Sequence, residues 1–167
     1  MSSRDPLPFD PIERAADNWR ERWGDARRMR LATSIMRAQQ ILINTYDDVL
    51  RPHGLTFARF EALALLRFSR SGALPMKIIG DRLQVHPTSV TNTVERLAAA
   101  GLVERRPNPR DGRGVLAAIT ATGREVVDAA AADLMRVDFA LAGLADSDVD
   151  AVSDVLTGLR RSVGDFG

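Results

Sequence analysis

Residues 86–114 read HPTSVTNTVERLAAAGLVERRPNPRDGRG. Pro87 suits the first position of a helix, where its missing N–H would have no partner, and Gly101 suits the position that stops one. The pattern therefore predicts a helix over residues 87–100. Its apolar side chains recur at Val90, Val94 and Leu97, which places them on one buried face.

The opposite face of this helix is short and polar. The side chains expected there are those of Thr88, Ser89, Thr91, Asn92 and Arg96. Hydroxyl and amide groups can hydrogen-bond to base edges or phosphates, and an arginine can fork onto a guanine edge or a phosphate. Such a face fits the major groove of double-stranded DNA. An ordinary amphipathic helix with a solvated polar face shows the same pattern, so the helix alone leaves both interpretations open.

The residues after Gly101 favour DNA, because they predict a β-hairpin with a positively charged loop. Residues 102–106 and 115–119 are β-prone, and turn formers dominate residues 107–114. The arginines expected to contact phosphates or the minor groove are Arg106, Arg110 and Arg113. Asp111 is expected to brace a wing arginine, since a carboxylate facing phosphate would be repelled. Helix and hairpin together indicate a winged helix-turn-helix.

Residues 74–83 predict the partner helix that precedes the turn Gln84-Val85-His86. Ile79 and Leu83 continue the apolar skeleton, and Gly80 allows the two helices to approach closely.

At these positions the chain resembles the MarR family of bacterial transcription regulators, over roughly residues 30–160. The residues that carry the resemblance are Gly54-Leu55-Thr56, Ser89-Val90-Thr91, Val94, Leu97, Ala100-Gly101-Leu102-Val103, Arg105, Asp111-x-Arg113 and Thr120-x-x-Gly123. Asn108 stands where the family commonly has an aspartate. The resemblance implies a homodimer that binds a pseudopalindromic operator and is released or retuned by a small ligand or an oxidant.

Composition limits these expectations. The 167 residues contain no cysteine, which excludes thiol redox sensing, disulfides and thiolate zinc sites. The net charge is +1, but residues 76–119 hold 7 basic and 4 acidic side chains, whereas residues 120–167 hold 4 and 9. The middle of the chain is therefore the expected electrostatic footprint on DNA. No apolar run of membrane-spanning length occurs, and the first residues lack a signal-peptide pattern, so we expect a cytoplasmic protein without a membrane partner.

Further helices are expected outside the DNA-reading part. They span residues 11–23, 27–50 and 56–70, the last one capped by Thr56, and two more begin near Thr122, which opens a capping-box pattern, and near Asp146. Apolar stripes at both chain ends would be poorly buried in a monomer and indicate a helical dimer interface. The fold class is thus mainly α with a small β-hairpin. The expected parts are an N-terminal extension (1–25), a dimerisation region made from both termini (26–54 and 120–167) and a winged helix-turn-helix (55–119).

Three residues are candidates for an effector pocket: Trp23, Gln39 and Phe60. Gln39 lies on the apolar stripe of the long helix, where a buried amide needs a partner; that partner is either a ligand or a group across the dimer. Trp23 follows Trp19 by one turn, a spacing that equally suits ordinary packing. A tryptophan on an added N-terminal helix, together with Glu61, is similar to the urate-responsive branch of the family, which uses an arginine where Thr93 stands.

The leading hypothesis is a dimeric, ligand-responsive, sequence-specific transcription regulator, acting as a repressor released by a small aromatic or acidic ligand. The alternative is a winged-helix protein-interaction module without specific DNA binding. An enzyme is not expected, because the sequence has no phosphate loop, metal cluster or nucleophile–base constellation. No cofactor and no metal are expected. His53 and His86 lie far apart in turn-like positions that suit surface or capping roles.

Overall fold

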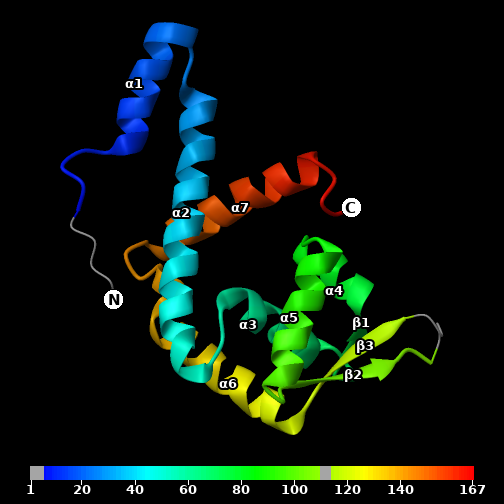
Figure 1. Cartoon of the computed structure of the whole chain (residues 1–167). Helices are drawn as coiled ribbons and strands as arrows, with labels where there is room; N and C mark the ends of the chain where they lie inside the picture. The colour runs from blue at the N-terminus through cyan, green and yellow to red at the C-terminus, as the bar shows by residue number, and fades with distance from the viewer. Residues whose placement is uncertain (1–5, 110–113) are drawn as a thin grey trace.

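The computed structural model describes residues 6–109 and 114–167 and shows a mainly helical chain with one small sheet (Figure 1). The elements in chain order are α1 (Pro11–Trp23), α2 (Arg27–Leu50), η1 (Arg51–His53), α3 (Phe57–Phe68), β1 (Ala73–Pro75), α4 (Met76–Leu83), α5 (Pro87–Ala99), β2 (Val103–Pro107), β3 (Val115–Ile119), α6 (Ala121–Arg136), η2 (Asp138–Ala140) and α7 (Asp146–Ser162). This arrangement confirms the predicted winged helix-turn-helix fold.

The sheet contains one strand that the sequence did not predict. The strands are antiparallel in the order β1-β3-β2, so β3 lies in the middle. Its residue Ala117 pairs with Leu74 of β1 on one side and with Arg105 of β2 on the other. The helix expected over 74–83 therefore begins two residues later, at Met76. Pro75 is tolerated in an edge strand because it has no N–H to give to the hydrogen-bond ladder.

The hydrophobic core lies where the second half of α2 meets α3, α4, α5, α6 and the sheet. Its largest fully buried side chains are those of Leu50, Leu63, Leu66, Ile79, Leu97, Leu134 and Val94. The helices α4 and α5 approach closely at Gly80, where an added Cβ would meet a methyl group of Val90 at 3.2 Å. The core thereby holds α5 in place by its apolar face.

Long-range polar contacts fasten the end of α2 and the following η1 to α6 and η2. The Nε2 atom of His53 lies 2.8 Å from Oδ2 of Asp133, and the hydroxyl of Tyr46 donates to the carbonyl oxygen of Phe139 at 2.9 Å. The hydrogen bond from His53, with Arg136 nearby, holds the pKa of Asp133 below its ordinary value.

Two helix caps differ from the sequence-based expectation. The side chain of Thr120, not Thr122, caps α6 by accepting from the N–H of Gly123 at 2.9 Å. Thr56 occupies the cap position of α3 without a side-chain cap bond, and Asp47 of α2 accepts from the N–H of Phe57 at 2.6 Å instead. A carboxylate brought in from α2 thus replaces the local hydroxyl.

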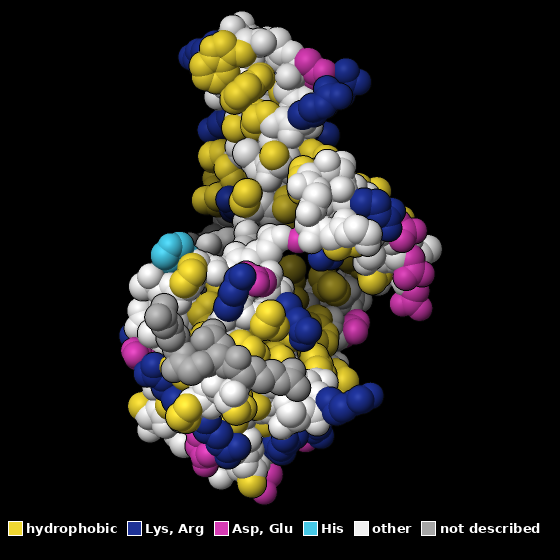
Figure 2. Space-filling view, turned by 90° about the vertical axis from the view of Figure 1, so that its right-hand side faces the viewer, with side chains coloured by type: hydrophobic (Ala, Val, Ile, Leu, Met, Phe, Trp, Pro, Cys, Tyr) yellow, Lys and Arg dark blue, Asp and Glu magenta, His cyan; other side chains and the backbone are white. Residues whose placement is uncertain are grey.

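The helices at the chain ends lie outside the core. The α1–α2 hairpin projects from the body of the molecule, and α7 has no buried residue among those described (Figure 1). Apolar side chains gather on the exposed surface of the α1–α2 hairpin, and the surface is hollowed beneath α7 (Figure 2). The exposed large apolar side chains of α1, α2 and α7 are those of Trp23, Leu31, Met36, Ile41, Val152, Val155 and Leu159. These surfaces have the composition of a protein interface.

Candidate nucleic-acid interface

Helix α5 presents a polar face above its buried apolar one. His86 caps the helix, since its Nδ1 accepts from the N–H of Thr88 at 3.2 Å, and Pro87 begins the first turn. The apolar residues of the predicted face are buried, whereas the side chains of Thr88, Ser89, Thr91, Asn92 and Arg96 are all exposed. The local sequence therefore produces a helix whose apolar side packs into the core while its polar side is exposed to a ligand.

The outer side of α5 is slightly concave. A depression of about 410 Å³ is lined by Pro87, Thr88, Thr91, Asn92 and Glu95. The hydroxyl of Thr91 donates to the carbonyl oxygen of Pro87 at 3.1 Å, which leaves its lone pairs to accept from a ligand. Hydroxyl, amide and carboxylate groups thus converge on one surface of the helix, with Ser89 and Arg96 beside them. This is a set of short hydrogen-bonding groups that base edges can match.

The hairpin places further arginines beside α5. Arg106 is exposed and bonded to Glu104 on its own strand at 2.6 Å. Arg105 reaches back to Glu95 of α5 at 3.3 Å. The N–H of Asn108 donates to the carbonyl oxygen of Gly114 at 2.9 Å and closes the hairpin. The predicted wing residues Arg110, Asp111 and Arg113 lie outside the described residues.

Sequence reasoning missed Glu95 and Arg105 as members of this surface. The signal for Glu95 was present, because it follows Thr91 by four residues and Asn92 by three and must therefore share their helix face. Arg105 gave no such signal, since its contact with α5 depends on how the hairpin packs.

The three candidate effector residues do not line one pocket in the single chain. Trp23 is 70% exposed and packs edge-on against Trp19, with ring centroids 4.7 Å apart. Gln39 is exposed on α2 rather than buried, whereas Phe60 is buried in the core. A position on the apolar stripe of α2 therefore does not by itself mean that the side chain is buried within one chain.

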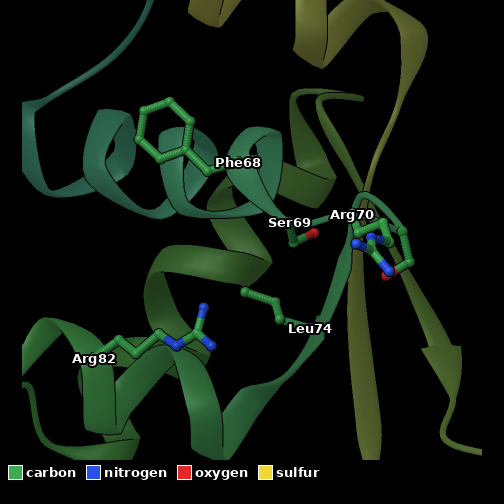
Figure 3. Close-up of a pocket in the computed structure, with 6 residues that line it drawn as sticks. Phe68, Ser69, Arg70, Leu74 and Arg82 are labelled. Carbon is green, nitrogen blue, oxygen red and sulfur yellow. The ribbon is translucent and has the colours of Figure 1, made fainter.

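A second depression, of about 540 Å³, lies elsewhere on the winged-helix part. It is lined by Phe68, Ser69, Arg70, Ser71, Leu74 and Arg82. Arg70 and Arg82 lie at opposite ends of it, so the two guanidinium groups do not converge on one point (Figure 3). None of the candidate effector residues lies there.

One carboxylate near the middle of α3 is poorly solvated. Glu61 is half-buried, and burial raises its pKa above the ordinary value of 4.5. Across residues 6–109 and 114–167 no cluster of three or more histidine, aspartate or glutamate side chains could hold a metal ion. None of the described helices is both long and apolar enough to cross a membrane.

Comparisons with known proteins agree with this geometry. A model of the MarR family matches residues 53–114. An HTH-type transcriptional regulator of Mycobacterium tuberculosis is 39% identical over 67 residues, which are 40% of this chain and 47% of that protein, so the alignment spans about half of the relative's length.

Two solved structures extend the likeness to the whole fold. A MarR variant from Escherichia coli complexed with operator DNA superposes with a TM-score of 0.73 at 24% identity, covering 80% of this chain and 96% of that one. Sco5413, a MarR family transcriptional regulator from Streptomyces coelicolor, is 57% identical with a TM-score of 0.78, over 83% of this chain and 96% of that one. Because the identity is high across nearly all of a solved member, this chain belongs to the MarR family of transcriptional regulators.

Proposed function

We propose that two copies of this chain bind double-stranded DNA at a pseudopalindromic operator and act as a transcriptional repressor that a small molecule releases. The observation that carries the proposal is the outer face of α5, where five exposed polar or cationic side chains stand beside a basic hairpin. Family members are transcription regulators rather than enzymes, and the Escherichia coli relative was solved on operator DNA. The part proposed to bind DNA spans residues 55–119.

The homodimer is supported by the unpartnered helices at both chain ends. Residues 26–54 and 120–167 carry apolar side chains that one chain leaves exposed on α2 and α7, and residues 1–25 add α1 to the same end of the molecule. A second copy would cover these surfaces by two-fold symmetry. The same symmetry places two recognition helices in successive major grooves, roughly 34–36 Å apart.

The effector is proposed to act by preferring one spacing of the recognition helices. A tenfold loss of operator affinity needs about 1.4 kcal/mol of such preference. Trp23 and Gln39 lie on surfaces that a second copy would cover, so an effector contact with them would form only in the dimer. Phe60, which is buried in the core, would form the inner wall of the proposed effector pocket. If a Gln39→Leu variant keeps the wild-type response to the effector, Gln39 does not belong to the pocket.

The test of DNA binding is selection of operator sequences from random duplexes by the full chain, followed by footprinting and sedimentation of the complex. We expect an inverted repeat with half-sites about one helical turn apart, bound by a dimer. When the selected operator is placed over a promoter, addition of the protein should lower transcription in a purified system. If the chain binds DNA without sequence preference and instead binds an acidic protein specifically, the protein-interaction module is favoured.

A further inference from the structure

Glu95 is a carboxylate on the surface that the proposed function assigns to DNA. It lines the depression on α5 together with Thr88, Thr91 and Asn92, and its side chain is 52% exposed. Successive residues of an α-helix are about 100° apart, so a residue three positions after Asn92 and four after Thr91 lies between them in direction. Glu95 therefore points toward the bound groove whenever these two residues do.

A carboxylate in that position must be matched by a donor. Phosphates carry the negative charge of DNA and repel a carboxylate, so a glutamate on this face weakens binding to the extent that no donor compensates its charge, and a base amino group is such a donor on the DNA. In the major groove the N4 amino donor of cytosine has an acceptor on one side only, the O6 atom of the paired guanine. The N6 amino group of adenine lies between two acceptors, its own N7 and the O4 of thymine, so one of them would face the second carboxylate oxygen. Cytosine is thus the base that suits Glu95.

Arg105 orients this carboxylate. Its Nη1 atom donates to Oε1 of Glu95 at 3.3 Å, which ties a long side chain of α5 to strand β2. Within the described parts of the chain, Oε2 of Glu95 has no hydrogen-bond partner. One oxygen is therefore anchored by the hairpin while the other can accept, and the guanidinium offsets part of the charge.

We propose that Glu95 is a specificity-determining residue that accepts a hydrogen bond from a cytosine N4 amino group in each half-site, with Arg105 as its positioning residue. The proposal rests on the proposed function, since it needs α5 in the major groove. Glu95 lies about 4.5 Å beyond Asn92 along the helix axis, close to the roughly 3.4 Å rise of one base pair. We therefore expect the cytosine within about one or two base pairs of any base that Asn92 contacts.

The experiment starts from the operator that the wild-type full chain selects from random duplexes. Each base pair of the half-site is then replaced in both halves, and dissociation constants are measured for the wild type, Glu95→Ala and the matched control Glu125→Ala. Replacing one particular C·G pair by T·A should weaken wild-type binding roughly tenfold. In Glu95→Ala that loss should shrink to about twofold or less while losses at other positions remain. Glu125→Ala removes the same charge from an exposed position on α6, outside residues 55–119, and should keep the wild-type profile.

Two further variants separate positioning and folding from readout. Arg105→Gln should reduce discrimination at the same base pair only, and should have no added effect when combined with Glu95→Ala. Glu95→Gln keeps the side-chain shape, and it should shift the preference from cytosine toward adenine, because an amide pairs with both N6 and N7. This variant keeps the test decisive if Glu95→Ala folds poorly.

The outcomes distinguish the two proposals. If Glu95→Ala tightens binding to every duplex by one common factor and leaves the profile unchanged, Glu95 only repels the backbone and its role in specificity is wrong. If the wild-type chain enriches no sequence at all, the proposed function fails before Glu95 is tested.

Discussion

Gly123 lies in the first turn of α6, where the absence of a side chain lets the helix begin against the backbone of the preceding segment. A Cβ there would overlap the carbonyl oxygen of Leu102 and come within 2.9 Å of a side-chain carbon of Ile119. Thr120 fastens the same turn, because its hydroxyl donates to Gly101 at 2.8 Å while accepting from Gly123. The Thr120-x-x-Gly123 motif is therefore a junction between the hairpin and α6.

Replacing Gly123 by alanine should lower the free energy of unfolding by about 1–3 kcal/mol, because the backbone contact cannot yield as a flexible side chain would. Gly158→Ala is the matched control, since nothing lies within 4 Å of a Cβ at that helical position. There the better helix propensity of alanine should raise stability by about 0.5–1 kcal/mol. Denaturant unfolding of both variants measures the contrast, and equal effects would contradict the packing at Gly123.

Glu61 offers a pH-dependent prediction. Burial raises its folded-state pKa above the ordinary value of 4.5, so the folded protein holds this proton more tightly than the unfolded chain does. Stability should therefore fall as pH rises through the folded pKa. Glu61→Gln should melt at a higher temperature than the wild type near neutral pH, and the difference should vanish well below 4.5. Glu125→Gln, which removes an exposed carboxylate from α6, is the matched control in the same melting series.

Helix α5 is the element on which the proposed readout depends. Its apolar face is anchored in the core, whereas Asn92 and Arg96 stand exposed on the opposite side. The hairpin beside it contributes paired rather than free arginines where the structure describes it, since Arg105 and Arg106 each contact a glutamate. Base specificity is therefore expected from the helix, and the described strands act mainly on its side chains.

Truncation of Asn92 or of Arg96 to alanine should cost roughly 1–3 kcal/mol on the selected operator and less on random DNA, if each contacts a base edge. Arg37→Ala is the control for charge alone, because Arg37 lies exposed on α2, away from α5. Gel-shift titrations on both DNAs give the comparison. Equal losses of affinity on operator and random DNA would show that the residue contacts phosphate rather than a base.

At the scale of the whole molecule, the chain divides into a packed winged-helix body and helices that extend from it without a core of their own. Described residues of α7 are all at least partly exposed, with Val155 and Leu159 more than half exposed. A helix this apolar on one side is stable only when something covers that side. One chain thus leaves the apolar side of α7 exposed, as the proposed dimer requires.

Leu159→Asp should weaken dimerisation at least tenfold, because burial of an unpaired carboxylate in an apolar interface is strongly unfavourable. The winged-helix body should keep its structure, since Leu159 is not part of the core. Ser147→Asp, exposed on the other side of α7, is the control that adds the same charge. Sedimentation equilibrium measures the dimer constant and circular dichroism checks folding; a fully dimeric Leu159→Asp would place the interface elsewhere.

Local signals determined most helix positions from the sequence alone. Proline at a first helical position and apolar spacing predicted Pro11–Trp23, Arg27–Leu50 and Pro87–Ala99 to within a residue or two, because a helix forms its hydrogen bonds within its own segment. The polar outer face of α5 followed from the same periodicity. These features need no knowledge of what lies across the fold.

The tertiary structure decided what depends on residues far apart in the chain. Ala73–Pro75 became a strand because β3, more than 40 residues later, offered it a free edge, and Asp47 rather than Thr56 took the first N–H of α3. Gln39 proved exposed although it lies on an apolar stripe, because periodicity does not tell whether another element covers that stripe. The pairing of Glu95 with Arg105 likewise required the hairpin to fold back on α5. Sheet pairing, capping from another element and ion pairs between elements are set by three-dimensional proximity, which periodicity along one segment does not encode.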